Sequence, residues 1–313
     1  VDCKLQQNLG GNPILAAAFG CDVSGDNYRS LAKLLKKVHG HAEAIGLEKI
    51  PADAKEQYQT MFKAVLPVLK KLDDITSSTM IPAIKQSGLG LVLDAKWKSK
   101  QWVGQLPAME NAMPMLELGL LVGLDDAKGF EKAMTGYRET LSELYAKIRE
   151  ASPSKEQMPE FAIPAPETEA VSSGKLFFYS LPDFGQDKQI QPVFGIGKTS
   201  SVLALSKAHA ERLMAGKSLE AKFAPLSRTW NKLGVAVLDW VALVDAFSPW
   251  TEFAIKSNPN IDDGSRPEIL KQAKTALEVL RCLKGGATAS FIEDGNIVSH
   301  NEVKIKDLEK APE

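Results

Sequence analysis

The histidine cluster is the first place in this chain where residue types and spacing could support chemistry. His39 and His41 flank Gly40, and Glu43 follows two residues later. In an extended segment these alternate side chains point the same way, so two imidazoles and a carboxylate could hold a transition metal. The cluster also lies where the first predicted helix ends, and a histidine is favourable there without any metal. We prefer the second interpretation, and the sequence predicts no resident metal and no other cofactor.

In a second group of residues, lysines alternate with aromatic residues, as in proteins that bind single-stranded nucleic acid. It consists of Lys96, Trp97, Lys98, Lys100 and Trp102. One interpretation is a contact surface for a polyanion or a glycan. The other is a strand end where lysine stems cover the tryptophan faces. Among the candidates, this run is our predicted contact surface.

Two further motifs fail on spacing. Residues 195–200 (GIGKTS) carry the GK[ST] ending of a phosphate-binding loop, but Pro192 stands where that loop needs its first glycine. The segment is typical of a turn between two antiparallel strands. Residues 258–264 (NPNIDDG) offer oxygen ligands, but an EF-hand register would place Pro259 and Ile261 at ligand positions. Catalytic residues need not be close in sequence, so an enzyme stays an alternative.

The chain has three cysteines, too few for a disulfide scaffold. Cys3 and Cys21 flank a short segment with glycine and proline and could close a disulfide loop; the alternative is two unpaired thiols. Cys282 follows the apolar spacing of a predicted helix, so we expect it to pack as a small hydrophobic residue.

Composition excludes several classes of protein. The 313 residues are 44% hydrophobic and 25% charged, and 38 Lys and Arg balance 39 Asp and Glu. The net charge of −1 excludes the basic footprint of a general nucleic-acid binder. No apolar run approaches the ~18 residues of a membrane span, because Asp239 and Asp245 interrupt the longest one. The chain begins at Val1 rather than Met; removal of a signal peptide would explain this, and so would a shortened expression product.

The elements that must position these residues follow from periodicity. Apolar residues at three- and four-residue spacing predict a helical hairpin over residues 26–40 and 51–72, with Pro67 kinking or dividing the second helix. Short apolar runs predict strands, and long amphipathic stretches predict helices. Residues 88–95, 115–123, 175–181, 190–197, 200–205 and 233–238 are the predicted strands, and residues 125–150, 207–215, 240–256 and 267–283 are the predicted helices. Residues 287–305 form a hairpin around Asp294-Gly295, whose residues tolerate positive φ angles.

These elements predict an α+β fold, in which an N-terminal helical hairpin accompanies two similar strand-rich units with helices packed on antiparallel sheet. Residues 88–102 echo residues 233–250, and residues 106–134 echo residues 181–214, which indicates a duplicated unit. The predicted segments are a helical region (residues 1–85), a first strand and helix unit (86–152), a proline-rich linker or crossing segment (153–173) and a second unit that ends in the hairpin (174–313).

Several long phrases of the sequence, SGLGLVLDAKWKSKQW, LPDFGQDKQIQPVFGIG and LDWVALVDAFSPW among them, resemble a bacterial family of uncharacterised exported proteins. The resemblance covers most of the chain from about Ile14 onward. It implies export to the periplasm or cell envelope and an α+β fold, and it assigns no site. We therefore expect a non-enzymatic binding or structural protein whose partner is an unknown protein or envelope component. The alternatives are a hydrolase whose site the sequence hides, and an assembly subunit that buries the helices of residues 31–72 in a partner.

Overall fold

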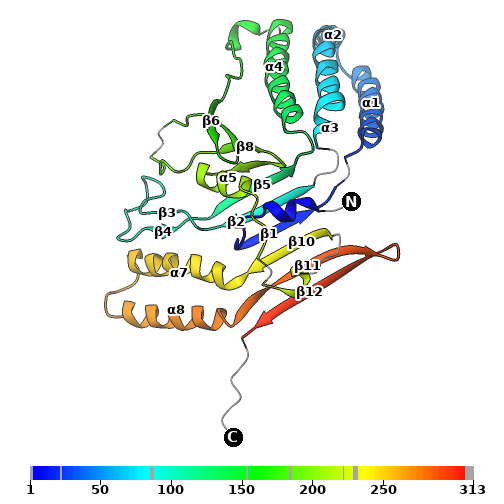
Figure 1. Cartoon of the computed structure of the whole chain (residues 1–313). Coiled ribbons are helices and arrows are strands. Elements are labelled where there is room, and N and C mark those ends of the chain that lie inside the picture. Colours follow the sequence, from blue (N-terminus) through cyan, green and yellow to red (C-terminus); the bar gives the residue numbers. More distant parts are fainter. Residues whose placement is uncertain are drawn as a thin grey trace. The chain divides into compact units, whose positions relative to one another are not determined.

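The computed structural model describes residues 3–21, 23–84, 88–152, 154–182, 185–220, 222–227 and 232–306 (Figure 1). Its contacts divide the chain into two compact units, each built from separate segments. The sheet unit comprises residues 1–21, 87–123 and 167–313, and the helical unit comprises residues 22–86 and 124–166. Strands in an antiparallel sheet and long helices together confirm the α+β class.

The sheet unit is organised by one ten-stranded sheet, in which every neighbouring pair is antiparallel. The strand order is β12-β11-β10-β1-β2-β5-β9-β8-β7-β6. The strands are β1 (Leu15–Phe19), β2 (Leu89–Asp94), β5 (Glu117–Gly123), β6 (Glu167–Val171), β7 (Gly174–Phe178), β8 (Val193–Gly197), β9 (Ser200–Ala204), β10 (Lys232–Asp239), β11 (Leu283–Glu293) and β12 (Asn296–Ile305). A separate two-stranded sheet pairs β3 (Lys98–Ser99) with β4 (Met113–Pro114).

The two faces of this sheet differ, because side chains alternate along each strand. On one face, which we call the core face, Val92, Leu121 and Val202 are buried with residues of two short helices. These are the 3₁₀ helix η1 (Lys4–Asn8), which contributes Leu5, and α5 (Lys207–Met214), which contributes Leu213. The other face, the open face, carries the remaining residues of the same strands.

Glycine lets α5 approach the sheet closely. A Cβ on Gly119 of β5 would lie 2.5 Å from Leu213 Cδ1, and one on Gly195 of β8 would lie 2.3 Å from Met214 Sδ. Both distances are well below van der Waals contact, so a side chain at either position would require Leu213 or Met214 to move. The predicted turn at residues 195–200 is the short connection between β8 and β9, as expected of a hairpin.

The C-terminal part of the sheet unit matches its prediction closely. The side chain of Asp239, at the end of β10, accepts a hydrogen bond from the Ala242 amide at 3.0 Å and so caps α7 (Trp240–Ser257). Helix α8 (Arg266–Leu280) packs on α7, and the short helix α6 (Ala224–Ser227) lies against β11 and β12. Asp294 and Gly295 have φ angles of 49° and 78°, which form the two-residue turn of the β11–β12 hairpin.

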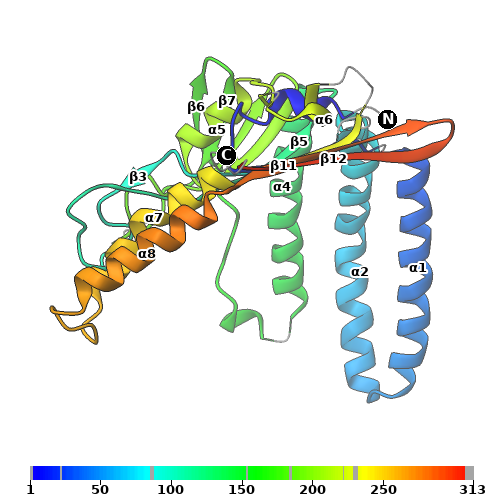
Figure 2. The same ribbon diagram turned by 90° about the horizontal axis from the view of Figure 1, so that it is seen from below.

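The helical unit is built from three long helices, which lie side by side in Figure 2. They are α1 (Gly25–Glu48), α2 (Ala52–Ile75) and α4 (Ala127–Ala151); α2 continues through a π-helical turn, η2 (Thr76–Met80), into α3 (Ile81–Ala83). A further short 3₁₀ helix, η3 (Lys155–Gln157), follows α4. Helices α2 and α4 pack together, with Val68 and Ala133 buried. Helix α1 has no buried residue, and two of its links to α2 are polar: Tyr28 donates to Asp73 at 2.6 Å, and His39 Nε2 lies 3.1 Å from the Tyr58 hydroxyl.

The structure corrects several local predictions. Helix α1 does not end at Gly40 but continues to Glu48, and Ser24 caps it, since its hydroxyl accepts from the Asn27 amide. A glycine inside a helix costs only about 1 kcal/mol, which the flanking turns offset. Pro67 neither ends nor divides α2. Cys282 is exposed, because the helix ends at Leu280 and the chain turns before β11.

The compact units also differ from the four predicted segments. The strands of residues 88–123 and 174–305 do not form two units, because β5 pairs with β9 and joins them in one sheet. Helix α4 belongs to the helical unit, and β6 falls within the segment predicted as a linker. The internal duplication stays a prediction.

Candidate functional site

The histidine candidates lie in the middle of α1, not in an extended segment. Residues two apart on a helix are rotated by about 200°, so His39 and His41 point in different directions. The ring of His39 stacks on Phe62 at 4.9 Å, and its Nδ1 lies 3.9 Å from Glu43 Oε2. In the part of the chain that the structure describes, no group of three or more His, Cys, Asp and Glu side chains is placed to hold a metal ion.

The predicted contact surface is only partly on the surface. Trp97 is buried, with 6% of it exposed, so it cannot contact a large partner. Trp102 is half-buried against Trp250, whose indole NH donates to the Pro114 carbonyl at 2.7 Å. Lys96, Lys98 and Lys100 are exposed. A contact role for these three lysines and for Trp102 stays a prediction. The buried Trp97 is no part of such a surface.

Cys3 and Cys21 both lie in the sheet unit. Cys3 is buried in the core just before η1, and Cys21 is partly exposed just after β1. The disulfide between them stays a prediction.

A buried charge cluster, which the sequence did not predict, lies where β2, β5 and α5 meet. Glu117 is fully buried, and its Oε2 lies 2.6 Å from Arg212 Nη2. The same carboxylate accepts hydrogen bonds from the amides of Lys96 and Trp97, at 3.1 and 3.2 Å, and from the Ser206 hydroxyl at 3.2 Å. These donors satisfy the hydrogen-bonding capacity of the buried carboxylate oxygens.

Asp94 completes the cluster. It is 5% exposed, and its Oδ2 lies 2.9 Å from Lys96 Nζ and 3.7 Å from Arg212 Nη2. Two carboxylates and two cations therefore balance one another within the sheet unit. The available signal was that Asp94 and Glu117 occupy core-face positions of otherwise apolar strands, where a charge must find a partner.

His209 of α5 lies beside this cluster. It is fully buried, and neither ring nitrogen has a hydrogen-bond partner. Burial lowers the pKa of His209 to about 4, although the neighbouring Glu117 carboxylate acts in the opposite direction. The imidazole is therefore neutral at neutral pH and packs over Gly119, where a Cβ would lie 3.1 Å from its Cε1.

This cluster holds α5 on the sheet. Its carboxylates are engaged by side chains and amides of the same chain, so they offer no acid and base pair to a substrate. We interpret it as a structural network.

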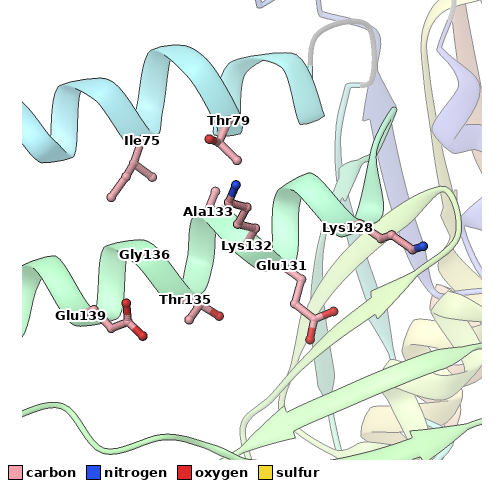
Figure 3. Close-up of a pocket in the computed structure, with 9 residues that line it drawn as sticks. All are labelled: Ile75, Thr79, Lys128, Glu131, Lys132, Ala133, Thr135, Gly136 and Glu139. Atoms are coloured by element: carbon pink, nitrogen blue, oxygen red, sulfur yellow. The ribbon is translucent and has the colours of Figure 1, made fainter.

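A cleft of about 460 Å³ lies in the helical unit between the end of α2 and the start of α4 (Figure 3). Figure 3 shows Ile75 and Thr79 on one wall and Lys132 pointing toward Thr79, while Glu131 and Glu139 point away. The lining mixes lysines and glutamates with small side chains, so it selects no single charge. Its lysines and glutamates do not converge on one point, so the cleft shows no set of polar groups that would orient a ligand.

The open face of the sheet is the most distinctive surface of the molecule. Six large apolar side chains lie there on four neighbouring strands, each between about a third and a half exposed: Phe19, Leu89, Leu91, Leu118, Leu120 and Leu203.

The pairing register makes these side chains contiguous. Phe19 faces Leu89 across β1 and β2, Leu91 faces Leu120, and Leu120 faces Leu203. The described residues of β1, β2, β5 and β9 that point to this face include no charged side chain. Contiguous exposed apolar patches are characteristic of interaction sites.

Comparison with protein-family models, curated proteins and solved structures gave no match to this chain. Among the described residues, none of the helices is both long enough and apolar enough to span a bilayer.

Proposed function

We propose that this chain is a non-enzymatic binding or structural protein whose contact surface is the open face of its sheet. The observation that carries the proposal is the row formed by Leu91, Leu120 and Leu203, which face one another across three strands and remain a third to a half exposed. Leaving them in water costs free energy, at about 25 cal/mol per Å² of apolar surface. Covering them on binding recovers it.

The partner that fits is a protein segment with an uncharged apolar side, such as an amphipathic helix. An α-helix with its side chains is about 10–12 Å wide, so it spans two to three strands spaced about 4.8 Å apart. The core face of the same sheet shows this packing, because α5 lies across β5, β9 and β8 there. Acyl chains are bound in enclosed sites that cover most of their surface, unlike this exposed row.

The binding test uses an 18-residue amphipathic peptide of leucine and lysine, titrated into the full chain by calorimetry. The wild type should bind it, and Leu120→Lys should weaken binding at least tenfold because a charge then sits in the centre of the patch. The matched control is Leu34→Lys on α1, a leucine of the helical unit that is 57% exposed against 43% for Leu120. Circular dichroism should show both variants folded.

Absence of binding, or equal binding by Leu120→Lys, would contradict the proposal. Loss of binding in Leu34→Lys alone would favour the assembly subunit instead. That alternative has its own support, because α1 exposes an apolar stripe: Leu31, Leu34, Leu35, Val38 and Ile45. The hydrolase alternative has no comparable observation, since the charge cluster around Glu117 is engaged internally.

The second part of the proposal concerns the localisation of the protein in the cell. We infer export to the periplasm or cell envelope from the resemblance of the three quoted sequence phrases to exported bacterial proteins. The measurement is fractionation of bacteria that express the complete gene. Recovery with periplasmic or envelope markers is expected; recovery with a cytoplasmic marker enzyme would refute export.

A further inference from the structure

Strand β12 is a long edge of the sheet. It spans ten residues, it stands at one end of the strand order, and no strand of the described residues pairs with its outer side. An edge strand presents unpaired amide and carbonyl groups, so it is a template for another strand. Its exposed side chains include Ile297, Val303 and Ile305, each at least 66% exposed.

The hairpin turn determines which backbone groups point outward. Glu293 and Asn296 flank the two-residue turn, so they exchange hydrogen bonds with each other. Backbone direction alternates along a strand, and the odd-numbered residues of β12 therefore direct their amides and carbonyls away from β11. These residues are Ile297, Ser299, Asn301, Val303 and Ile305.

Edge strands are commonly protected by charged side chains, but those of β12 are engaged on the core face of their own chain. Glu302 accepts from the Ala224 amide at 2.5 Å. Lys304 donates to the Lys222 carbonyl, and its Nζ lies 5.0 Å from the centre of the Phe223 ring. These contacts hold both charged side chains near α6, so they do not shield the outer edge.

We propose that β12 pairs antiparallel with β12 of a second copy of this chain, about a two-fold axis at Asn301. In this register Ile297 lies opposite Ile305 of the second copy, and Ser299 lies opposite its Val303. The apolar pair of Ile297 with Ile305 adds a favourable side-chain contact to the backbone hydrogen bonds. The pairing is isologous, so each such pair occurs twice.

Charge disfavours the register whose axis lies at Glu302. With the axis at Asn301, Glu302 lies opposite His300 and Lys304 lies opposite Val298. Moving the axis by one residue, to Glu302, places two glutamates directly opposite each other, which is destabilising. The dimer is independent of the proposed binding function, because β12 and the leucine row lie on different strands of the sheet.

The first test measures the mass of the full chain by analytical ultracentrifugation over a range of concentrations. The wild type should shift from monomer to dimer as concentration rises. Asn301→Pro should stay monomeric, because proline removes an outward amide, which an edge strand tolerates without loss of fold. The control Asn301→Thr keeps the amide and should dimerise as the wild type does.

The second test reads the register directly and uses a Cys282→Ser background to remove the exposed native thiol. Asn301→Cys places two thiols opposite each other at about 5.5 Å between Cα atoms, within reach of a disulfide. Mild oxidation should therefore cross-link it. Ser299→Cys lies opposite Val303 and should not cross-link.

Three results would overturn the proposal. The wild type would remain a monomer at every concentration, or Asn301→Pro would dimerise as well as Asn301→Thr. Equal cross-linking of the two cysteine variants would exclude the register centred on Asn301.

Discussion

At the scale of single residues, His209 makes the stability of the protein depend on pH. Burial lowers its pKa to about 4, whereas an unfolded chain has a histidine pKa near 6.5. Between these two values the unfolded state binds more protons than the folded state, so acid favours unfolding. Stability is therefore full above about pH 6.5 and falls as pH is lowered toward 4, by about 3 kcal/mol in total from this residue.

Urea unfolding at a series of pH values between 4 and 7 measures this slope. The comparison variant is His209→Leu, which keeps an apolar side chain over Gly119 and has no proton to bind. Its stability should change less with pH than that of the wild type across this window. Parallel pH profiles for the two proteins would show that His209 does not carry the dependence.

The same residues show what sequence can and cannot predict about a site. Asp94 and Glu117 stand out in the sequence as charges in apolar strands, but their partner Arg212 follows 95 residues after Glu117. Only the pairing of β5 with β9 and the short connection to α5 bring the three together. Trp97 illustrates the opposite error. Its basic neighbours suggested a surface, whereas its chain position beside Glu117 buries it.

At the scale of elements, local patterns predicted most helices and strands, because each has a clear period and a terminal signal. Asp126 and Asp239 cap α4 and α7 as polar residues before apolar runs do. The predicted end of the first helix was wrong because one residue was given too much weight. Gly40 lies inside α1, since the neighbouring turns supply more favourable free energy than one poor helix former costs.

The open face shows how an element-scale pattern can mislead. Strands such as β2 read as continuous apolar runs, which is typical of strands buried on both faces. Here Val92 is buried on the core face, while Leu91 is exposed on the open face. The sequence could not separate these cases, because both give the same residue types. Only the structure therefore shows that the leucines of the proposed binding surface are exposed.

At the scale of the whole molecule, the order of strands could not be read from the sequence. The first strand, β1, lies between β10 and β2, so residues near the start of the chain pair with residues more than 200 positions later. The internal echoes suggested two separate units, yet the strands of both belong to one sheet. Non-local pairing of this kind depends on which edges meet during folding, and short-range periodicity does not specify it.

The uneven burial of the chain leads to a prediction about its dynamics, measured by amide hydrogen exchange. Amides exchange slowly where opening requires the loss of buried apolar contacts and quickly where little is buried. Strands β5 and β9 are central in the sheet and contribute Leu121 and Val202 to the core, so they should exchange slowest.

Helix α1 has no buried residue and should exchange fastest of the three long helices. Helix α2, which buries Val65 and Val68, provides the matched comparison of equal length. If α1 is protected as strongly as α2 in the isolated chain, its leucine stripe is covered in solution, and the assembly-subunit alternative loses its support.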